Sequence, residues 1–222
     1  METMRLQPLS GVVFVALVAL ATVGLAGATP GSDASASELV SFYGDSWRQF
    51  FAAIVLAASI PFLVVFAAGI AGAAATAAPG REDRSVWRFV LIAGAAVTAA
   101  VVLVQALLHM ALTDGADQGV PESALQAVNT VAGSMWVPFF AALGLMMLGA
   151  AGCLIPSAGA YRWLGWTALV LGIALFIPAA DFFAALLAAV WFVVAGVTMA
   201  RGAGRASERR RSMAPSSAAT AD

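Results

Sequence analysis

The sequence predicts an all-α polytopic membrane protein, a bundle of six transmembrane helices with both termini in the cytoplasm. Hydrophobic residues make up 62% of the 222 residues and charged residues 10%, against roughly 45–50% and 25% in soluble domains. The apolar residues gather in runs that approach or exceed the roughly 20 residues needed to cross a bilayer. All eleven basic residues are arginines, and they fall almost entirely on one side of the predicted topology. Lipid is therefore the predicted solvent for most of the chain.

Six apolar runs define the predicted spans. The first covers residues 9–28 and ends in Ala26-Gly27-Ala28, which resembles a signal-peptidase site. We expect this run to remain as an uncleaved helix, because it is longer than a usual signal-peptide core and further spans follow; a cleaved signal peptide is the alternative. The other spans are predicted over 50–78, 87–113, 129–155, 163–177 and 182–200.

Prolines and small residues shape the predicted bundle. Pro61 and Pro138 each remove a backbone donor inside a span, so we expect kinks in the second and fourth helices. The run of small residues at the end of the second span predicts a packing face, because close packing drives helix association in lipid. The single cysteine, Cys153, cannot form an intrachain disulfide, and its small neighbours favour a packed thiol.

Three polar segments connect or follow the spans. Ser35 and Glu38 fit a capping box that starts an interfacial helix over 35–47. We interpret this helix as a lead-in that sets the depth of the second span; a lid over an outward-facing cavity is the alternative. Residues 114–128 predict an acidic loop. Residues 201–222 predict a disordered basic tail, because they are rich in Arg, Ser and Ala.

The arginines orient the bundle. With the N-terminus inside, ten of the eleven arginines are cytoplasmic and only Arg48 is outside, which agrees with the positive-inside rule. This predicts a multi-pass protein of a bacterial plasma membrane with cytoplasmic termini. The tail arginines are expected either to anchor the topology or to contact anionic lipids; they are Arg201, Arg205, Arg209, Arg210 and Arg211.

The third predicted span carries the candidate site. It holds Gln105 and the only histidine, His109, one helical turn apart, and polar groups at membrane depth are often functional. A histidine beside a carboxylate such as Asp114 can act as a proton relay or a ligand anchor. The alternative is that histidine and glutamine simply hydrogen-bond to neighbouring helices. The candidate outward-facing pocket comprises His109, Gln105, Ser134, Asn129, Asp181 and Asp114.

Missing motifs narrow the function. One histidine cannot supply paired haem ligands or a His-rich di-iron site, and no CxxC, H-E-x-x-H or G-x-S-x-G occurs. The sequence predicts no cofactor, metal or nucleic-acid partner. The favoured function is non-enzymatic: a subunit or structural partner in a membrane complex, or a homo-oligomer, packed through small-residue faces. The alternatives are a small transporter or lipid- or small-molecule-binding protein using a pocket near His109, and a membrane enzyme of unrecognised type.

Three short patterns mark the layout: TPGSDASASELVSFY after the first span, WR before the second, and YRWLGW at the start of the fifth. In these patterns the chain resembles a group of uncharacterised six-helix integral membrane proteins of actinobacteria. The resemblance implies the six-helix layout over most of the chain, and it implies no activity and no site residue.

Overall fold

The computed structural model describes residues 7–31, 33–77, 83–157 and 161–213, and these form helices joined by short turns, with no strand among them. This confirms the predicted all-α class. Within the described part of the chain, five segments are long and apolar enough to cross a membrane: Gln7–Ala26, Trp47–Ala75, Ser85–Gln118, Glu122–Leu154 and Asp181–Gly202. The protein is therefore a helical membrane protein.

Two of these segments are each interrupted just before a proline. Helices α4 (Ser46–Ala58) and α5 (Ile60–Ala77) meet at Ser59, two residues before Pro61. Helices α7 (Glu122–Ser134) and α8 (Trp136–Leu154) meet at Met135, three residues before Pro138. A proline cannot donate to the carbonyl four residues back, so the interruptions lie in the turn where the sequence predicted kinks.

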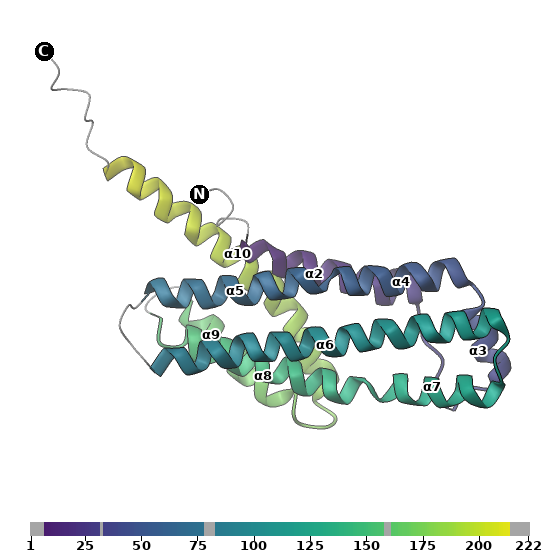
Figure 1. Ribbon diagram of the computed structural model, residues 1–222. Helices are drawn as coiled ribbons and strands as arrows, with labels where there is room; N and C mark the ends of the chain where they lie inside the picture. The colour runs from purple at the N-terminus through teal and green to yellow at the C-terminus, as the bar shows by residue number, and fades with distance from the viewer. Residues whose placement is uncertain (1–6, 32, 78–82, 158–160, 214–222) are drawn as a thin grey trace, which may run out of the picture.

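Helix α6 (Asp83–Gln118) is the central rod and lies alongside α4, α5 and α8 (Figure 1). Its 36 residues rise about 54 Å, well beyond the roughly 30 Å of a bilayer core. The prediction of a loop over 114–128 is therefore wrong: only residues 119–121 connect α6 to α7. Gly119 adopts a left-handed φ of 67°, and the Val120 amide donates to the Gly115 carbonyl over 3.1 Å, which closes the helix in a Schellman motif.

The first helical segment and the last helix of the chain pack against each other. The first segment consists of η1 (Gln7–Leu9), α2 (Ser10–Ala19) and η2 (Leu20–Ala26), and it packs against α10 (Asp181–Met213) and α5. Helix α9 (Arg162–Ala174) packs mainly against α8 and also against α10. Its 13 residues rise about 20 Å, less than the predicted fifth span requires.

Helix α10 also differs from the sequence prediction at its C-terminal end. It continues to Met213, so the first part of the predicted disordered tail is helical, and its last turns project away from the bundle (Figure 1). Residues 214–222 lie outside the described part of the chain, as do the side chains of Arg205 and 209–211. Arginine and alanine are strong helix formers, which explains why the helix runs on past its apolar part.

Two separate cores hold the helices together. The larger one, the inner core, includes Phe66, Met146, Met147, Leu164 and Phe192. The smaller one, the outer core, consists of Leu39, Tyr43, Leu112 and Leu125, where α3 (Ala36–Tyr43) packs on the ends of α6 and α7. The capping box predicted at the start of α3 is present, with Ser35 and Glu38 each bonding the other's backbone amide.

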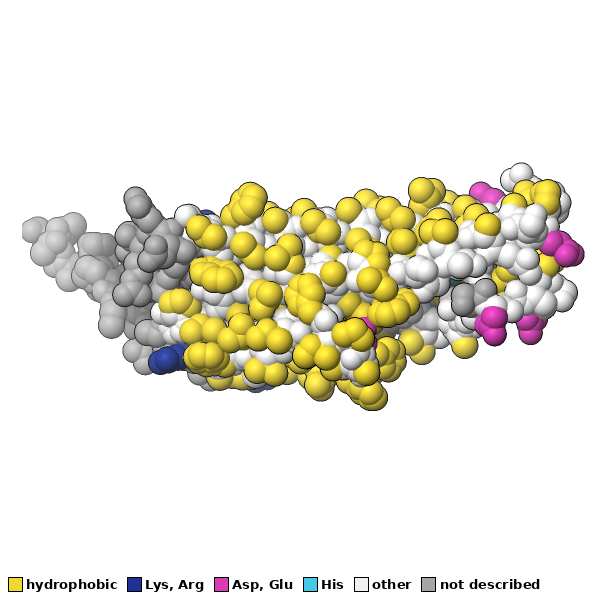
Figure 2. Space-filling model, turned by 90° about the horizontal axis from the view of Figure 1, so that it is seen from below, with side chains coloured by type: hydrophobic (Ala, Val, Ile, Leu, Met, Phe, Trp, Pro, Cys, Tyr) yellow, Lys and Arg dark blue, Asp and Glu magenta, His cyan; other side chains and the backbone are white. Residues whose placement is uncertain are grey.

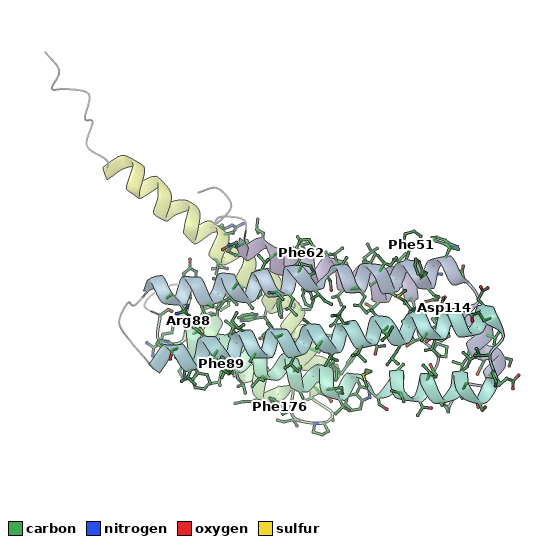
Figure 3. All side chains as sticks on the ribbon, viewed as in Figure 1. Phe51, Phe62, Arg88, Phe89, Asp114 and Phe176 are labelled. Carbon is green, nitrogen blue, oxygen red and sulfur yellow. The ribbon has the colours of Figure 1, made fainter. Side chains whose placement is uncertain are left out.

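The surface divides in the same way as the core. Hydrophobic side chains cover most of the face seen in Figure 2, whereas acidic side chains gather at one end and arginine lies at the other. Asp114 lies at the acidic end with α3, and Arg88 lies at the opposite end (Figure 3). The helices around the outer core therefore form a polar head on an apolar bundle.

Candidate functional site

A cavity lies where the first helical segment, α4, α6 and the α7–α8 junction come together. It has two lobes of about 320 Å³ and about 210 Å³, which share Thr22, Thr29, Leu56 and Gln105. The larger lobe is in the size range of small-molecule sites, roughly 300–1,000 Å³. Its remaining lining is mainly apolar: Val18, Val101, Val102, Ala132, Gly133, Met135, Trp136 and Phe139. The smaller lobe extends to His109.

Gln105 lines both lobes. Its side-chain oxygen, Oε1, is buried and has no hydrogen-bond partner, and it is the only such buried side-chain atom among the described residues. A buried polar atom without a partner costs about 1–3 kcal/mol in desolvation, and such atoms are rare in native proteins. The side-chain amide of Gln105, which lines the cavity, therefore has hydrogen-bonding capacity that the protein leaves unused.

His109, one turn further along α6, has the opposite environment. Only 8% of its surface is exposed, and its Nε2 lies 2.7 Å from Oε1 of Gln49 on α4. The Gln49 amide donates in turn to the Phe42 carbonyl over 3.4 Å, which identifies Oε1 as the acceptor of the pair. His109 Nε2 therefore carries the proton, and Nδ1 of the neutral ring keeps its lone pair.

Helix periodicity explains why these groups meet. Residues four apart share one face of a helix, so Gln105, His109 and Thr113 form a polar stripe on α6. Thr113 donates back to the His109 carbonyl over 2.9 Å. The His109 ring lies at an interplanar angle of 72° to the ring of Tyr43 in the outer core, with 5.3 Å between the ring centroids. Burial raises the pKa of Tyr43 to about 12, because the phenolate is poorly solvated there.

The other predicted site residues lie elsewhere. Asp114 is exposed, and the partner of His109 is Gln49. Asn129 is buried and donates to the Gly31 carbonyl over 2.9 Å, which ties α7 to the segment before α3. Ser134 donates to the Thr130 carbonyl over 3.0 Å. Asp181 accepts from the amide of the next residue at the start of α10. Of the six, only Gln105 and His109 line the cavity.

Sequence reasoning missed Gln49 and the first helical segment as parts of the site. Gln49 belongs to the stretch Trp47-Arg48-Gln49, which reads as the polar rim of a span. Its hydrogen bond to His109 joins residues 60 positions apart, and no local periodicity reports such a pairing. Thr22 and Thr29 flank the predicted end of the first span, so their approach to Gln105 depends on how that helix packs.

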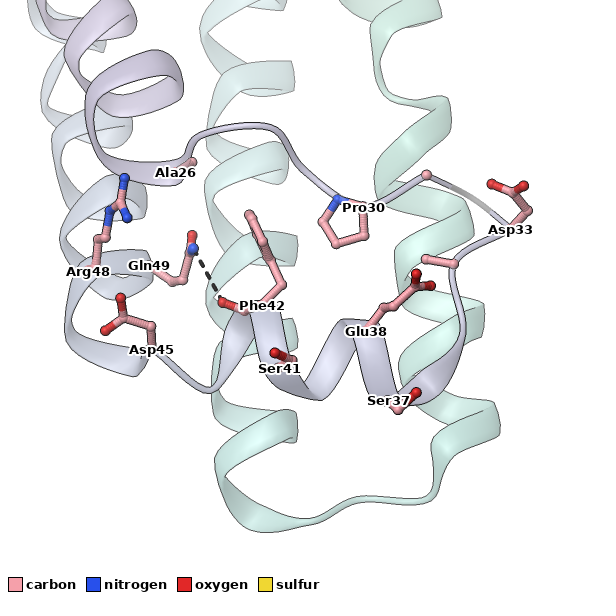
Figure 4. Close-up of a pocket in the computed structure, with 12 residues that line it drawn as sticks. Ala26, Pro30, Asp33, Ser37, Glu38, Ser41, Phe42, Asp45, Arg48 and Gln49 are labelled. Carbon is pink, nitrogen blue, oxygen red and sulfur yellow. Dashed lines mark hydrogen bonds between the residues drawn. The ribbon is translucent and has the colours of Figure 1, made fainter.

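A second hollow lies on the polar head, on the other side of Gln49. It measures about 770 Å³ and is lined by Asp33, Glu38 and Asp45 together with Arg48 and Gln49 (Figure 4). Arg48 donates to the Gly24 carbonyl over 3.4 Å. The Gln49–His109 pair therefore stands between this acidic hollow and the smaller lobe of the cavity.

Comparison with protein-family models, with curated proteins and with solved structures finds no match for this chain. Among the described residues, no group of three or more His, Cys, Asp or Glu side chains is placed to hold a metal ion. The cavity beside Gln105 is therefore the main feature that bears on function.

Proposed function

We propose that this chain is a non-enzymatic, multi-pass protein of a bacterial plasma membrane that binds an amphipathic molecule in the cavity beside Gln105. The observation that carries the proposal is the buried, unpartnered Gln105 Oε1. A structural glutamine would bond to a neighbouring helix, as Gln49 does. Gln105 instead lines a space large enough for a ligand, so a bound molecule can complete the hydrogen bonding of this side-chain amide.

The depth of the cavity favours a ligand from the outer leaflet. Trp87, beside Arg88, is 43% exposed and marks one interface of the membrane. Gln105 lies about 27 Å further along α6, near the far boundary of a bilayer core roughly 30 Å thick. A lipid has its head group and the start of its chain at this depth. Trp136, which lines the larger lobe, is 51% exposed, so the cavity reaches the lipid-facing surface.

Homo-oligomerisation or assembly with a partner through small-residue faces has less support. Ala67, Ala71 and Ala74 of α5 are buried within the chain itself. A glycine–backbone contact likewise joins α6 to α8, because a Cβ added at Gly94 would lie 2.5 Å from the Met146 nitrogen. The faces that predicted a partner helix are thus already occupied by this chain's own helices.

The proposed topology has six spans with both termini in the cytoplasm. It is supported by exposed arginines at one end, Arg88, Arg162 and Arg201, and by an acidic polar head at the other. Helices α9 and α10 pack together and are joined by a short turn over 175–180. Arg162 at the start of α9 and Arg201 near the end of the apolar part of α10 are therefore proposed to share a side of the membrane, even though α9 is short. On that side, the tail arginines are proposed to contact anionic lipid.

Cysteine labelling in whole cells tests this topology. Cys153 is fully buried, so the natural chain supplies a low background. A membrane-impermeant maleimide is expected to label Asp117→Cys and to label Arg201→Cys only after the cells are opened. Both positions are exposed, so accessibility within the protein is matched. Labelling of Arg201→Cys in intact cells would reverse the orientation.

Native mass spectrometry tests the binding function. The wild-type protein, purified in a mild detergent, is expected to carry an added mass that Gln105→Leu loses. Gln126→Leu is the matched control, because Gln126 is exposed on α7, and it should keep the adduct. A wild-type protein without any adduct after reconstitution in native lipid, or an equal adduct on Gln105→Leu, would contradict the proposal.

A further inference from the structure

We propose that the ligand of the cavity is a neutral acylglycerol, a lipid with a fatty-acyl ester and at least one free glycerol hydroxyl. Its ester carbonyl accepts a hydrogen bond from the amide nitrogen of Gln105, Nε2, and its hydroxyl donates one to His109 Nδ1. This inference rests on the proposed binding function and specifies its chemistry. Its support comes from the free atoms of the two side chains, from their depth in the bilayer, and from the charge and form of the lining.

The two ends of the Gln105 side-chain amide differ in accessibility. Oε1 is the only side-chain atom of the described residues that is both buried and unpartnered. Nε2 has no hydrogen-bond partner among these residues either, so it is accessible from the lobes that Gln105 lines. This nitrogen carries two N–H groups and is a donor only. Gln105 therefore requires a ligand group that accepts a hydrogen bond, as an ester carbonyl does.

His109 offers the complementary atom one helical turn further out, in the smaller lobe. Its Nε2 is bonded to Gln49 Oε1 over 2.7 Å, so Nδ1 of the neutral ring is an acceptor. A ligand that satisfies both Gln105 and His109 needs an acceptor and a donor separated by about 6 Å along the helix axis. A fatty acid, alcohol or amine carries its polar atoms in a single group, whereas the ester and the hydroxyl of an acylglycerol are separate groups that can reach both side chains.

The order of the two side chains matches the order of these groups in a lipid. Gln105 lies about 27 Å from Trp87 along α6, just inside the far boundary of a bilayer core roughly 30 Å thick, and His109 lies about 33 Å from Trp87, just beyond it. The ester carbonyls of glycerolipids lie at the edge of the hydrocarbon, and glycerol hydroxyls lie nearer to water. The deeper side chain thus supplies the donor for the ester, and the shallower one supplies the acceptor for the hydroxyl.

The charge of the lining favours a neutral lipid. None of the described residues that line the two lobes is an acid or an arginine, and a buried charge without a counter-charge is costly. Arg48 and the acidic side chains of the head line the separate hollow, and the Gln49–His109 pair lies between that hollow and the cavity. A phosphate or an ammonium group in the cavity would therefore have no arginine or acid to pair with.

The remaining lining fits a hydrocarbon chain. Leu56, Val101 and Phe139 supply an apolar wall, and Trp136 stands at the edge with half of its surface exposed. A chain that starts at Gln105 and passes Trp136 enters the bilayer at the depth of other lipid chains, which keeps its apolar surface out of water. The acyl chain thus continues from the ester directly into the outer leaflet.

Four probes with one brominated chain and different polar ends test the inference. They are a dibromostearoyl monoglyceride, its alkyl-ether analogue without the carbonyl, its dimethoxy derivative without free hydroxyls, and dibromostearic acid. Each is added to the full-length protein in nanodiscs of ether-linked phospholipid, so that no ester of the bulk lipid competes. Bromine quenches tryptophan at short range, and Trp136 lines the cavity. The signal from this site is the saturable quenching in the wild-type protein that is missing in Trp136→Phe.

The monoglyceride is expected to bind the wild-type protein about tenfold more tightly than each of the other three probes, the effect of one hydrogen bond of roughly 1.4 kcal/mol. Gln105→Leu should lose the preference for the ester over the ether and keep the preference for free over methylated hydroxyls, because His109 is unchanged. Gln126→Leu, altered at an exposed position of α7, should keep both preferences. The comparison of ester with ether in the wild-type protein needs no variant, so the test does not depend on the folding of Gln105→Leu.

The outcomes separate this inference from the proposed function. Saturable binding of the ester and the ether with equal affinity, an ester preference that persists in Gln105→Leu, or tighter binding of the methylated probe or the acid would overturn the acylglycerol assignment and leave the binding function standing. The absence of any saturable, Trp136-dependent quenching by all four probes would overturn both.

Discussion

The inner core and the outer core are built on different principles. The inner core combines large apolar side chains such as Phe66 and Phe192 with close backbone approaches: Gly94 faces the Met146 nitrogen and Gly149 faces the backbone of Leu91. The outer core differs in having a buried polar pair beside it: the ring of Tyr43 contacts His109, and His109 is hydrogen-bonded to Gln49. Close packing holds helices together in lipid, where there is no water to exclude. Where the helices contact water, burial of apolar surface and paired polar groups stabilise them. The cavity lies between the two cores, beside Gln105 and His109 of α6.

The largest loss of stability is expected from a substitution in the inner core. Gly149→Ala places a Cβ against the Leu91 backbone, which cannot yield as a flexible side chain does, so the free energy of unfolding should fall by about 3 kcal/mol. Gly72→Ala is the control, since a Cβ there meets nothing within 4 Å, and it should be neutral or slightly stabilising. Unfolding by a denaturing detergent measures both. Equal stability of the two variants would remove close packing as the basis of the inner core.

The next largest effect is expected from breaking the His109–Gln49 pair beside the outer core. His109→Leu leaves the buried Gln49 Oε1 without its donor, and the expected cost is about 1–3 kcal/mol. Gln49→Leu should cost a similar amount, and the double variant should cost less than the sum of the two, because the second change removes an atom that the first left unpaired. Strictly additive costs in a double-mutant cycle would show that the pair does not act as a unit.

Alkaline pH tests the burial of the outer core without a mutation. The folded-state pKa of Tyr43 is raised from 10.0 to about 12, so the folded protein favours the protonated phenol. The resulting stability is fully present below pH 10 and is lost as the pH rises toward 12. Phenolate absorbance of the wild-type protein, compared with Tyr43→Phe, measures the titration. A transition of Tyr43 near pH 10 in the folded protein would contradict the burial described for this side chain.

The smallest effect on stability is expected at the boundary between the cores. Gln105→Leu removes an acceptor that has no partner in the protein, so the variant stripped of lipid should be as stable as the wild type or slightly more stable. His109→Leu, one helical turn away, should by contrast lower the free energy of unfolding by about 1–3 kcal/mol. A loss of stability in lipid-free Gln105→Leu as large as that of His109→Leu would mean that Gln105 is bonded within the protein.

Composition, helical runs and prolines predict much of the fold, but they predict little of the site. Apolar runs located the main helices, and Pro61 and Pro138 located the two interruptions, because these signals act within a few residues along the chain. The continuation of α6 through Asp114 to Gln118 was missed because acidic residues read as a loop. They are instead the exposed face of a helix whose Leu112 is buried in the outer core.

The site depends on contacts between distant segments. Gln105 and His109 were recognisable as polar residues in an apolar run, but the sequence alone could not show that His109 is satisfied by Gln49 whereas Gln105 Oε1 is not. That difference arises from the packing of η2 and α4 against α6. The sequence also grouped Asp181 and Ser134 with the site through their apparent depth, although neither lines the cavity.

A structure determined in nanodiscs of native lipid tests the central claim most directly. We predict elongated density in the cavity, with its polar end within about 3 Å of the Gln105 side-chain amide and its apolar part passing Trp136. A cavity closed by neighbouring side chains, with Gln105 Oε1 accepting a hydrogen bond from the protein itself, would contradict the account.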